Sequence, residues 1–312
     1  MIERKKRSRP VFEELEDRTT PATVTVNAGS VVETVPTNFL GVNAAWWDSI
    51  GTTAQTQALV QAAGIGAIRI TGGSSADTFH FTDPPPYAGA GTAANMATLI
   101  SNLGATGIVT VNYGTGSPQE AAALIAYLNA ATTSTASIGV GEKWSDASQS
   151  WGSVDWKTAG YWASIRAATP LKVDDGLNFL RIGRSAPFNI RYFEIGNEDY
   201  GSWETDEHGT GGDTGHPHDP ATYVAFAKQV QTLSSPFAPA ISIGIDADET
   251  YSSAWVASVL QQSVSQGFTV GWISDHNYMQ EPGNESDSTL LEGTSSNASS
   301  ATDWSNRAAV YH

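Results

Sequence analysis

Asn197 and Glu198 lie side by side where an apolar segment, Ile190–Ile195, gives way to acidic and glycine-rich residues. The apolar segment predicts a short strand, and the residues after the pair predict a loop. A carboxyl group at such a junction is held rigidly and can still meet a ligand. The apolar residues Phe193 and Ile195 predict partial desolvation, which raises the pKa of a carboxyl group and suits a general acid near neutral pH. The alternative is that Glu198 caps a turn or pairs with an arginine.

Strand and helix patterns alternate along the chain on both sides of this pair. The predicted strands are residues 39–43, 67–73, 107–114, 190–195, 241–248 and 270–279, and the predicted helices are residues 52–64, 92–104, 117–129, 157–168, 219–233 and 252–264. The third helix is signalled by Ser117 as N-cap, by Pro118 and by Glu120, as in a capping box. The segment between residues 129 and 157 is predicted to be irregular. Such alternation is typical of a parallel sheet with helical crossovers.

Each predicted strand has a polar residue at or near its carboxyl end. These residues are Asn43, Arg69, Asn112, Glu198, Asp246 and His276. An open doubly wound sheet and an eightfold barrel both fit the number of strands. In a barrel all strand ends converge on one mouth, whereas an open sheet uses only the crevice at its switch point. The sequence therefore predicts an α/β fold of the (β/α)8 TIM-barrel type with about six β/α units, preceded by an N-terminal β segment.

Four motifs in chain order resemble the α-L-arabinofuranosidases of glycoside hydrolase family 51, in clan A. They are RITGGSSADTFHF from Arg69, VNYGTGSPQEAAALIAYLN from Val111, YFEIGNE from Tyr192 and DHNYM from Asp275. The first departs from the family at Thr71, where proline is usual. The resemblance extends from about residue 41 to about residue 279. It implies a retaining glycosidase whose (β/α)8 barrel is accompanied by a β-sandwich.

The resemblance also implies roles for individual residues. Glu198 would be the acid/base, which protonates the leaving glycosidic oxygen and then activates water. Asn197 would hydrogen-bond the sugar 2-hydroxyl group. His276 and Tyr278 would line the subsite, and Asn112 would lie near the sugar.

Other interpretations of these side chains remain open. Arg69 is expected to organise carboxylates through charge-assisted hydrogen bonds, or to be a buried ion-pair partner. Asn112 could cap a turn, and His276 could be a core histidine with satisfied hydrogen bonds. Of the neighbouring Trp46 and Trp47, one is expected in the core, and Trp47 is our candidate for stacking on a sugar face.

A retaining glycosidase needs a second carboxyl group about 5–5.5 Å from the first. In this clan it is a glutamate at the end of the seventh strand, but the sixth predicted strand ends near Met279. Glu281, Glu285 and Glu292 follow in loop sequence that does not resemble the nucleophile strand. We therefore expect a fragment in which the nucleophile is not present.

Three functions remain open on this basis. The first is a retaining glycoside hydrolase of oligosaccharides or polysaccharides, similar to an α-L-arabinofuranosidase. The second is a catalytically inactive fragment or a surface carbohydrate-binding protein on the same scaffold. The third is another clan A specificity, such as a xylosidase or an endoglucanase.

Composition limits the partners. The net charge is −16, and five of the 16 basic residues lie among the first nine, so the rest of the chain is more acidic still. Such a body should repel nucleic acid and anionic membranes, whereas a neutral carbohydrate substrate fits.

Cysteine is absent, which excludes disulfides and thiolate metal sites. No apolar run approaches the ~18 residues of a membrane span. The sequence does not indicate the oligomeric state.

No metal or organic cofactor is required by the expected chemistry. The loop of residues 207–220 contains His208, His216 and His218, but their spacing matches no standard metal signature. We expect this loop to shape an outer subsite of the barrel.

The N-terminus divides into two predicted segments before the barrel. Residues 1–21 are basic and lack the apolar core of a signal peptide, so composition alone indicates a basic tail. Within them, FEELEDRTTPA resembles the N-terminal segment of planctomycete extracellular proteins, which implies an extracellular or cell-surface location. Residues 22–37 alternate as a β segment that could belong to an accessory β-sandwich, and residues 38–312 are expected to form the truncated barrel domain.

Overall fold

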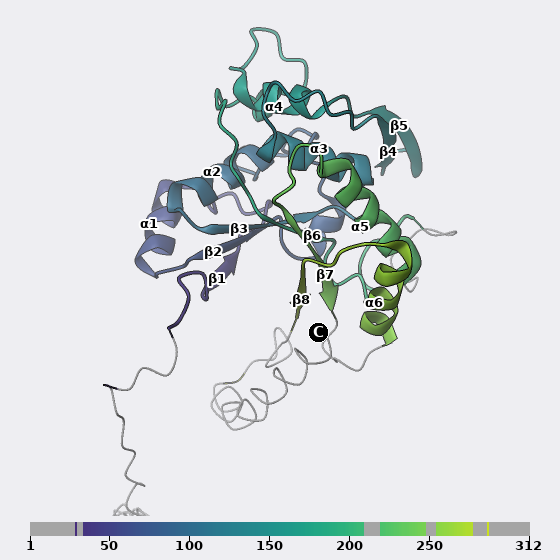
Figure 1. Cartoon of the computed structure of the whole chain (residues 1–312). Helices are drawn as coiled ribbons and strands as arrows, with labels where there is room; N and C mark the ends of the chain where they lie inside the picture. The colour runs from purple at the N-terminus through teal and green to yellow at the C-terminus, as the bar shows by residue number, and fades with distance from the viewer. Residues whose placement is uncertain (1–28, 30–33, 209–218, 248–253, 277–285, 287–312) are drawn as a thin grey trace, which may run out of the picture. The chain divides into compact units, whose positions relative to one another are not determined.

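The computed structural model of the chain describes residues 29, 34–208, 219–247, 254–276 and 286 (Figure 1). The chain divides into two compact units, residues 1–36 and residues 37–312, and the second contains all the helices and strands described below. The predicted basic segment 1–21 lies outside the described residues, as does most of the predicted β segment 22–37.

Six parallel strands form one sheet. They are β1 (Gly41–Asn43), β2 (Ala67–Ile70), β3 (Thr106–Val111), β6 (Tyr192–Ile195), β7 (Ser242–Ala247) and β8 (Trp272–Asp275). Each pairs with the next in chain order, so the sheet has no point at which the strand order reverses. That order is typical of a barrel and not of a doubly wound sheet. The predicted barrel-type fold is confirmed as a curled half-barrel of six parallel strands, five of which are followed by a helix within the described residues (Figure 1).

Helices follow the strands at the predicted positions. They are α1 (Ala54–Ala62), α2 (Ala93–Leu103), α3 (Pro118–Asn129), α4 (Ala159–Ala167), α5 (Pro220–Ser234) and α6 (Ala254–Gln266), with short 3-10 helices η1 (Ser74–Thr78) and η2 (Asn178–Leu180). Five of them begin at an N-cap side chain that accepts a backbone N–H of the first turn: Thr53, Thr92, Ser117, Thr158 and Asp219. These caps satisfy donors that a helix end leaves unpaired, which fixes where each helix begins.

Three local predictions are corrected. Glu120 does not complete a capping box, because its carboxylate pairs with His80 Nδ1 at 2.9 Å instead of returning to the N-cap. Strand β3 ends at Val111, before the predicted Gly114, because the Asn112 side chain accepts the N–H groups of Thr115 and Gly116 and turns the chain. The segment predicted to be irregular contains an antiparallel hairpin.

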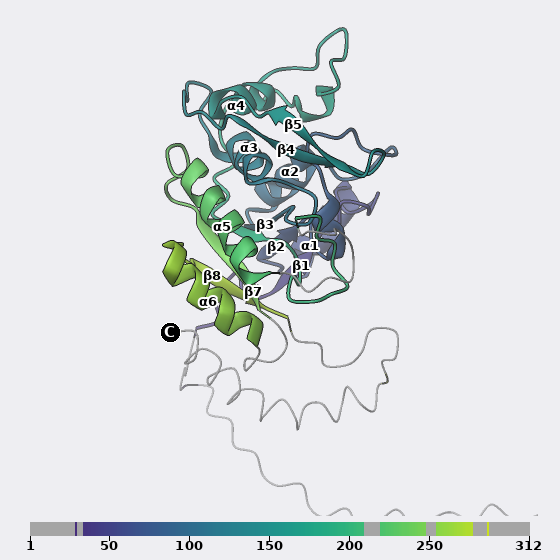
Figure 2. The same ribbon diagram turned by 90° about the vertical axis from the view of Figure 1, so that its right-hand side faces the viewer.

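This hairpin consists of β4 (Val140–Ser145) and β5 (Ser150–Asp155) and lies beside α3, apart from the parallel sheet (Figure 2). Trp144 and Trp151 face each other across it, with ring centroids 5.6 Å apart. Cross-strand aromatic pairs of this kind stabilise a hairpin.

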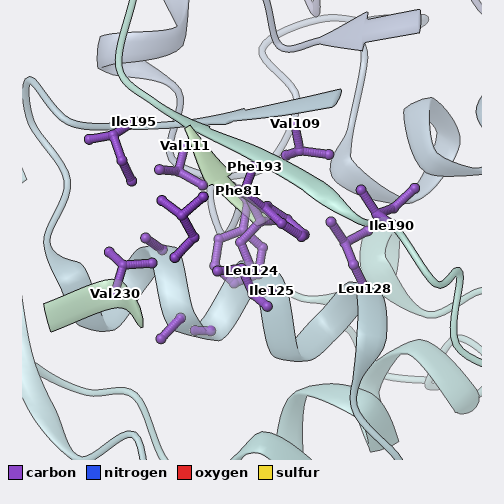
Figure 3. Close-up of a cluster of buried hydrophobic side chains, with 14 of the residues drawn as sticks. Phe81, Val109, Val111, Leu124, Ile125, Leu128, Ile190, Phe193, Ile195 and Val230 are labelled. Carbon is purple, nitrogen blue, oxygen red and sulfur yellow. The ribbon is translucent and has the colours of Figure 1, made fainter. Parts of the chain in front are cut away.

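The hydrophobic core lies between the sheet and its helices (Figure 3). Val109, Val111, Phe193 and Ile195 project from β3 and β6 and pack against side chains of α3 and α5, which include Leu124, Ile125, Leu128 and Val230. Successive residues of β3 and β6 are buried, as is typical of parallel strands that are covered on both faces. The one charged residue within β6, Glu194, is therefore conspicuous. No helix among the described residues is long and apolar enough to cross a membrane.

Candidate functional site

A cavity of about 300 Å³ opens where the carboxyl ends of β1, β2, β6 and β8 meet. Its lining residues are Asn43, Arg69, Gly73, Ser74, Asn197, Glu198 and His276. Four predicted site residues are therefore brought together from three strands that are far apart in the sequence. The barrel topology explains this, since parallel strands deliver their carboxyl ends to one rim.

Glu198 forms hydrogen bonds with two aromatic side chains at this rim. Its Oε1 lies 2.5 Å from His276 Nδ1, and its Oε2 accepts the indole N–H of Trp203 at 3.2 Å. The carboxyl side chain is 12% exposed, so it is largely shielded from water and still reaches the cavity. A shielded carboxyl group with polar partners is what proton transfer to a ligand requires.

The Glu198–His276 contact shifts the titration of the imidazole. Burial of His276 is the largest single influence and disfavours its charged form, but the hydrogen bond to Glu198 and the negative charges of Glu194 and Glu198 together outweigh it, so the pKa of His276 is raised above its ordinary value. The His276 imidazole therefore keeps its positive charge to higher pH than a free imidazole would.

Arg69 binds Glu194 and Asn197 at the same time. Its Nε donates to Glu194 Oε2 at 2.6 Å, and its Nη2 donates to Asn197 Oδ1 at 3.1 Å. Thr110 Oγ1 also donates to Glu194 Oε2, at 2.6 Å. The Glu194 side chain has no exposed area. The ion pair thus anchors the guanidinium group, and the guanidinium group holds the oxygen of the Asn197 amide.

The nitrogen of the same amide is held from the other side. Asn197 Nδ2 donates to Glu204 Oε1 at 2.8 Å, and Ser74 Oγ donates to the same oxygen at 2.8 Å. Burial raises the pKa of Glu204. With Arg69 on its oxygen and Glu204 on its nitrogen, the Asn197 amide has one defined orientation at the cavity wall.

Two predicted site residues lie away from the cavity lining. Asn112 is buried in the turn after β3, where its Oδ1 accepts two backbone N–H groups and its Nδ2 donates to Thr115 Oγ1. Trp47 is 58% exposed, while Trp46 packs on Phe79 with ring centroids 5.7 Å apart. The contacts of Asn112 are therefore those of a residue that caps a turn, which is one of the two roles that the sequence left open.

Six of the candidate residues lie outside the described part of the chain: Tyr278, Glu281, Glu285, Glu292, His216 and His218. His208 is described, and its two ring nitrogens face Asp206 Oδ1 and the Gly116 carbonyl oxygen at 3.1 and 3.0 Å. Within the part of the chain that the structure describes, no cluster of His, Cys, Asp and Glu could hold a metal ion.

Three partners in the site were not predicted from the sequence: Glu194, Trp203 and Glu204. For Glu194 a signal existed, because a lone acid inside an apolar strand must find a cation. Trp203 and Glu204 lie in the loop after β6, where no periodicity indicates the direction of a side chain.

Comparison with known proteins adds a fold similarity. No protein-family model and no curated protein matches the chain. Among solved structures, a family 51 α-L-arabinofuranosidase from Bifidobacterium longum is 15% identical, with a TM-score of 0.59 over 91% of this chain and 54% of that chain. The GH51 arabinofuranosidase from Xanthomonas axonopodis pv. citri is 16% identical, with a TM-score of 0.55 over 88% of this chain and 54% of that chain.

A third structure, described as an arabinofuranosidase, is 18% identical, with a TM-score of 0.54 over 80% of this chain and 47% of that chain. The chain thus spans about half the length of the solved proteins it matches. At these identities the similarity concerns the fold, which is that of part of the barrel in family 51 arabinofuranosidases.

Proposed function

We propose that the chain is a glycoside hydrolase of the retaining, two-carboxylate type, that Glu198 is its acid/base, and that α-L-arabinofuranosides are its substrates. The observation that supports this most is the position of Glu198 in the cavity, hydrogen-bonded to His276 and Trp203. A general acid/base must come within hydrogen-bond reach of the reacting oxygen, and a carboxyl group that lines a cavity can do so.

The remaining cavity residues fit the binding of a sugar. Asn197 lines the cavity and its Nδ2 gives one hydrogen to Glu204; in this proposal its second hydrogen would bond a sugar 2-hydroxyl group. That hydrogen bond strengthens as positive charge develops on the sugar ring. Arg69 acts through Asn197, whose amide it orients.

The nucleophile remains an expectation from the family resemblance. Glu198 is the only acidic residue that lines the cavity within the described ranges. The resemblance implies a glutamate at the end of a seventh strand, beyond the six strands described. We propose a surface carbohydrate-binding protein without hydrolase activity, on the same scaffold, as the second candidate function. We further propose an extracellular or cell-surface location, on the sequence of residues 1–21 alone.

The test is hydrolysis of a panel of aryl glycosides, namely arabinofuranosides, xylosides and glucosides. With a poor leaving group, Glu198→Gln should lower kcat by about 100-fold or more, because general acid catalysis contributes ~10²–10⁴-fold. With a leaving group that needs no protonation, the loss in the glycosylation step should be much smaller. Glu120→Gln, a change at a buried carboxyl group outside the cavity, is the control.

Two results would count against the hydrolase. Equal activity of Glu198→Gln and the original chain on the poor leaving group would remove the acid/base assignment. No hydrolysis on the whole panel, together with sugar binding that is lost in Asn197→Ala, would favour the carbohydrate-binding alternative.

A further inference from the structure

The backbone at Glu198 has a conformation that glutamate rarely adopts. Its φ angle is +52°, in the left-handed region, and Gly196 two residues earlier has a φ angle of +63°. Residues other than glycine stay in this region only where the surrounding structure holds them there. The direction of the Glu198 side chain depends on this backbone, so whatever holds residues 197–199 also aims the carboxyl group.

Two buried carboxyl groups hold the backbone on either side of Glu198. Asp77 Oδ2 accepts the N–H of Asn197 at 3.0 Å, and Asp246 Oδ2 accepts the N–H of Asp199 in a close contact. Both aspartates are completely buried. They come from different elements, since Asp77 lies in η1 and Asp246 in β7.

Each aspartate is anchored in its turn. The second oxygen of Asp77 accepts the N–H groups of Tyr113 and Gly114, at 3.3 and 3.4 Å, which ties it to the end of β3. The N–H of Asp246 donates to the Tyr223 hydroxyl group at 3.2 Å, and this hydroxyl group donates to the Ile195 carbonyl oxygen at 2.7 Å. The Asp77 carboxyl group therefore connects the peptide segment 197–199 to the end of β3, and the Asp246 carboxyl group connects it to β7, whose backbone is tied to α5 through Tyr223.

Burying acidic side chains this close together costs free energy of folding, and apolar residues at the same positions would avoid that cost. Burial raises the pKa of Asp77 and raises the pKa of Asp246 to about 7. The titratable groups that act on one or both of them are Glu194, Asp199, Glu204, Tyr223 and His276, besides each other. Aliphatic side chains of similar size would remove this cost but could not accept the two N–H groups.

We propose that Asp77 and Asp246 are positioning residues for Glu198, which hold residues 197–199 so that the Glu198 carboxyl group meets His276 and the cavity. Their catalytic importance rests on the proposed function, whereas their effect on the Glu198–His276 contact does not.

The test compares Asp246→Asn with Asp246→Leu. Both remove the charge of Asp246, but only asparagine keeps an oxygen for the Asp199 N–H, so their difference isolates the positioning effect from the electrostatic one. The readout is the His276 imidazole, followed by nuclear magnetic resonance through its ring nitrogen shifts and its pKa. Glu198→Gln provides the value for an imidazole without its carboxylate partner.

We expect Asp246→Asn to keep the hydrogen-bonded Nδ1 signal of His276, and Asp246→Leu to lose it and to shift the pKa of His276 to the value in Glu198→Gln. Glu120→Leu removes another buried carboxyl group, one that does not contact residues 197–199, and should leave His276 unchanged. If Asp246→Leu does not fold, Asp246→Ala takes its place. The same His276 signals in the aliphatic and asparagine variants would overturn the proposal.

This readout separates the inference from the proposed function. Loss of the His276 signal in an aliphatic variant of a chain that hydrolyses no glycoside would support the positioning role and count against the hydrolase. Where the chain is active, an aliphatic variant should lower kcat on a poor leaving group more than it raises KM, and asparagine should restore most of kcat.

Discussion

The ion pair between Arg69 and Glu194 is the most buried charge contact of the site. The exposed fractions of the two side chains are 13% and 0%, and one oxygen of Glu194 has no hydrogen-bond partner among the residues that the structure describes. Arg69→Met should therefore lower the free energy of unfolding by about 3–5 kcal/mol, because it leaves an uncompensated buried carboxylate. Urea denaturation at pH 7 measures this loss.

The double variant Arg69→Met/Glu194→Gln is the control for this prediction. It removes the stranded charge and should recover most of the lost stability, since a neutral amide can still accept the Thr110 hydroxyl group. If Arg69→Met unfolds at the same urea concentration as the original chain, the pair contributes little and another group supports Asn197.

The contact of Trp203 with Glu198 depends on a glycine two residues before the indole. A Cβ atom at Gly201 would lie 2.3 Å from indole ring atoms, so the ring rests directly on the glycine backbone. Trp203 is 60% exposed and can swing outward. Gly201→Ala should therefore change stability by less than about 1 kcal/mol but break the indole hydrogen bond to Glu198.

The indole N–H resonance of Trp203 checks this prediction by moving towards the position of a solvent-exposed indole. Gly152→Ala is a matched control, because a Cβ atom there would meet only the Lys143 carbonyl oxygen, at 3.8 Å. An unmoved Trp203 resonance in Gly201→Ala would contradict the interpretation that the glycine is needed for this contact.

At the scale of elements, the sequence predicted what depends on local chemistry. Thr92, Ser117 and Asp219 are strong N-cap residues, and the helices that follow them begin where predicted. The hairpin β4–β5 was missed because its strands show no clear alternation and its stability comes partly from packing on α3.

The site residues divide in the same way, into those that their place at a strand end predicts and those that depend on tertiary contacts. Arg69, Asn197, Glu198 and His276 could be placed at one rim, because strand ends in a barrel converge. Asn112 could not be assigned to cavity or turn, since both use an amide at a strand end. Partners such as Glu204 depend on loop conformation, which tertiary contacts determine.

Arg166 connects elements that are distant from the site. This fully buried side chain in α4 donates to the carbonyl oxygens of Tyr127, Ala130, Arg184 and Ser185. It thus fastens the end of α3 and the segment before β6 to α4. Arg166→Met should lower the free energy of unfolding by more than about 3 kcal/mol, because each buried carbonyl group left unpaired costs about 1–3 kcal/mol.

Chemical denaturation measures this, and Arg184→Met is the comparison. Arg184 packs on the Phe188 ring and is hydrogen-bonded only to nearby carbonyl groups, so its loss should cost about 1 kcal/mol or less. Equal effects of the two substitutions would mean that Arg166 does not join these elements.

For the whole molecule, negative charge has two separate effects on stability. The net charge of −16 produces repulsion at the surface, which dissolved salt screens. Asp77, Asp199 and Asp246 are instead buried together, and burial raises the pKa of each. Salt screens buried groups much less, so the two effects can be separated by measuring stability against pH at low and high ionic strength.

The sign of the buried contribution follows from Asp246. Its pKa is about 7 in the folded chain and near 4 in the unfolded chain, so the folded state holds the extra proton between these values. The contribution of Asp246 to stability should therefore be greatest below about pH 4, and it should fall as the pH rises to about 7. The melting temperature should decrease from pH 5 to pH 8 even in 0.5 M salt, roughly the ionic strength at which surface repulsion is strongly screened. In Asp246→Asn, which keeps the N–H acceptor without the titration, the decrease should be smaller. Equal slopes in the two proteins at high salt would show that Asp246 does not titrate in this range.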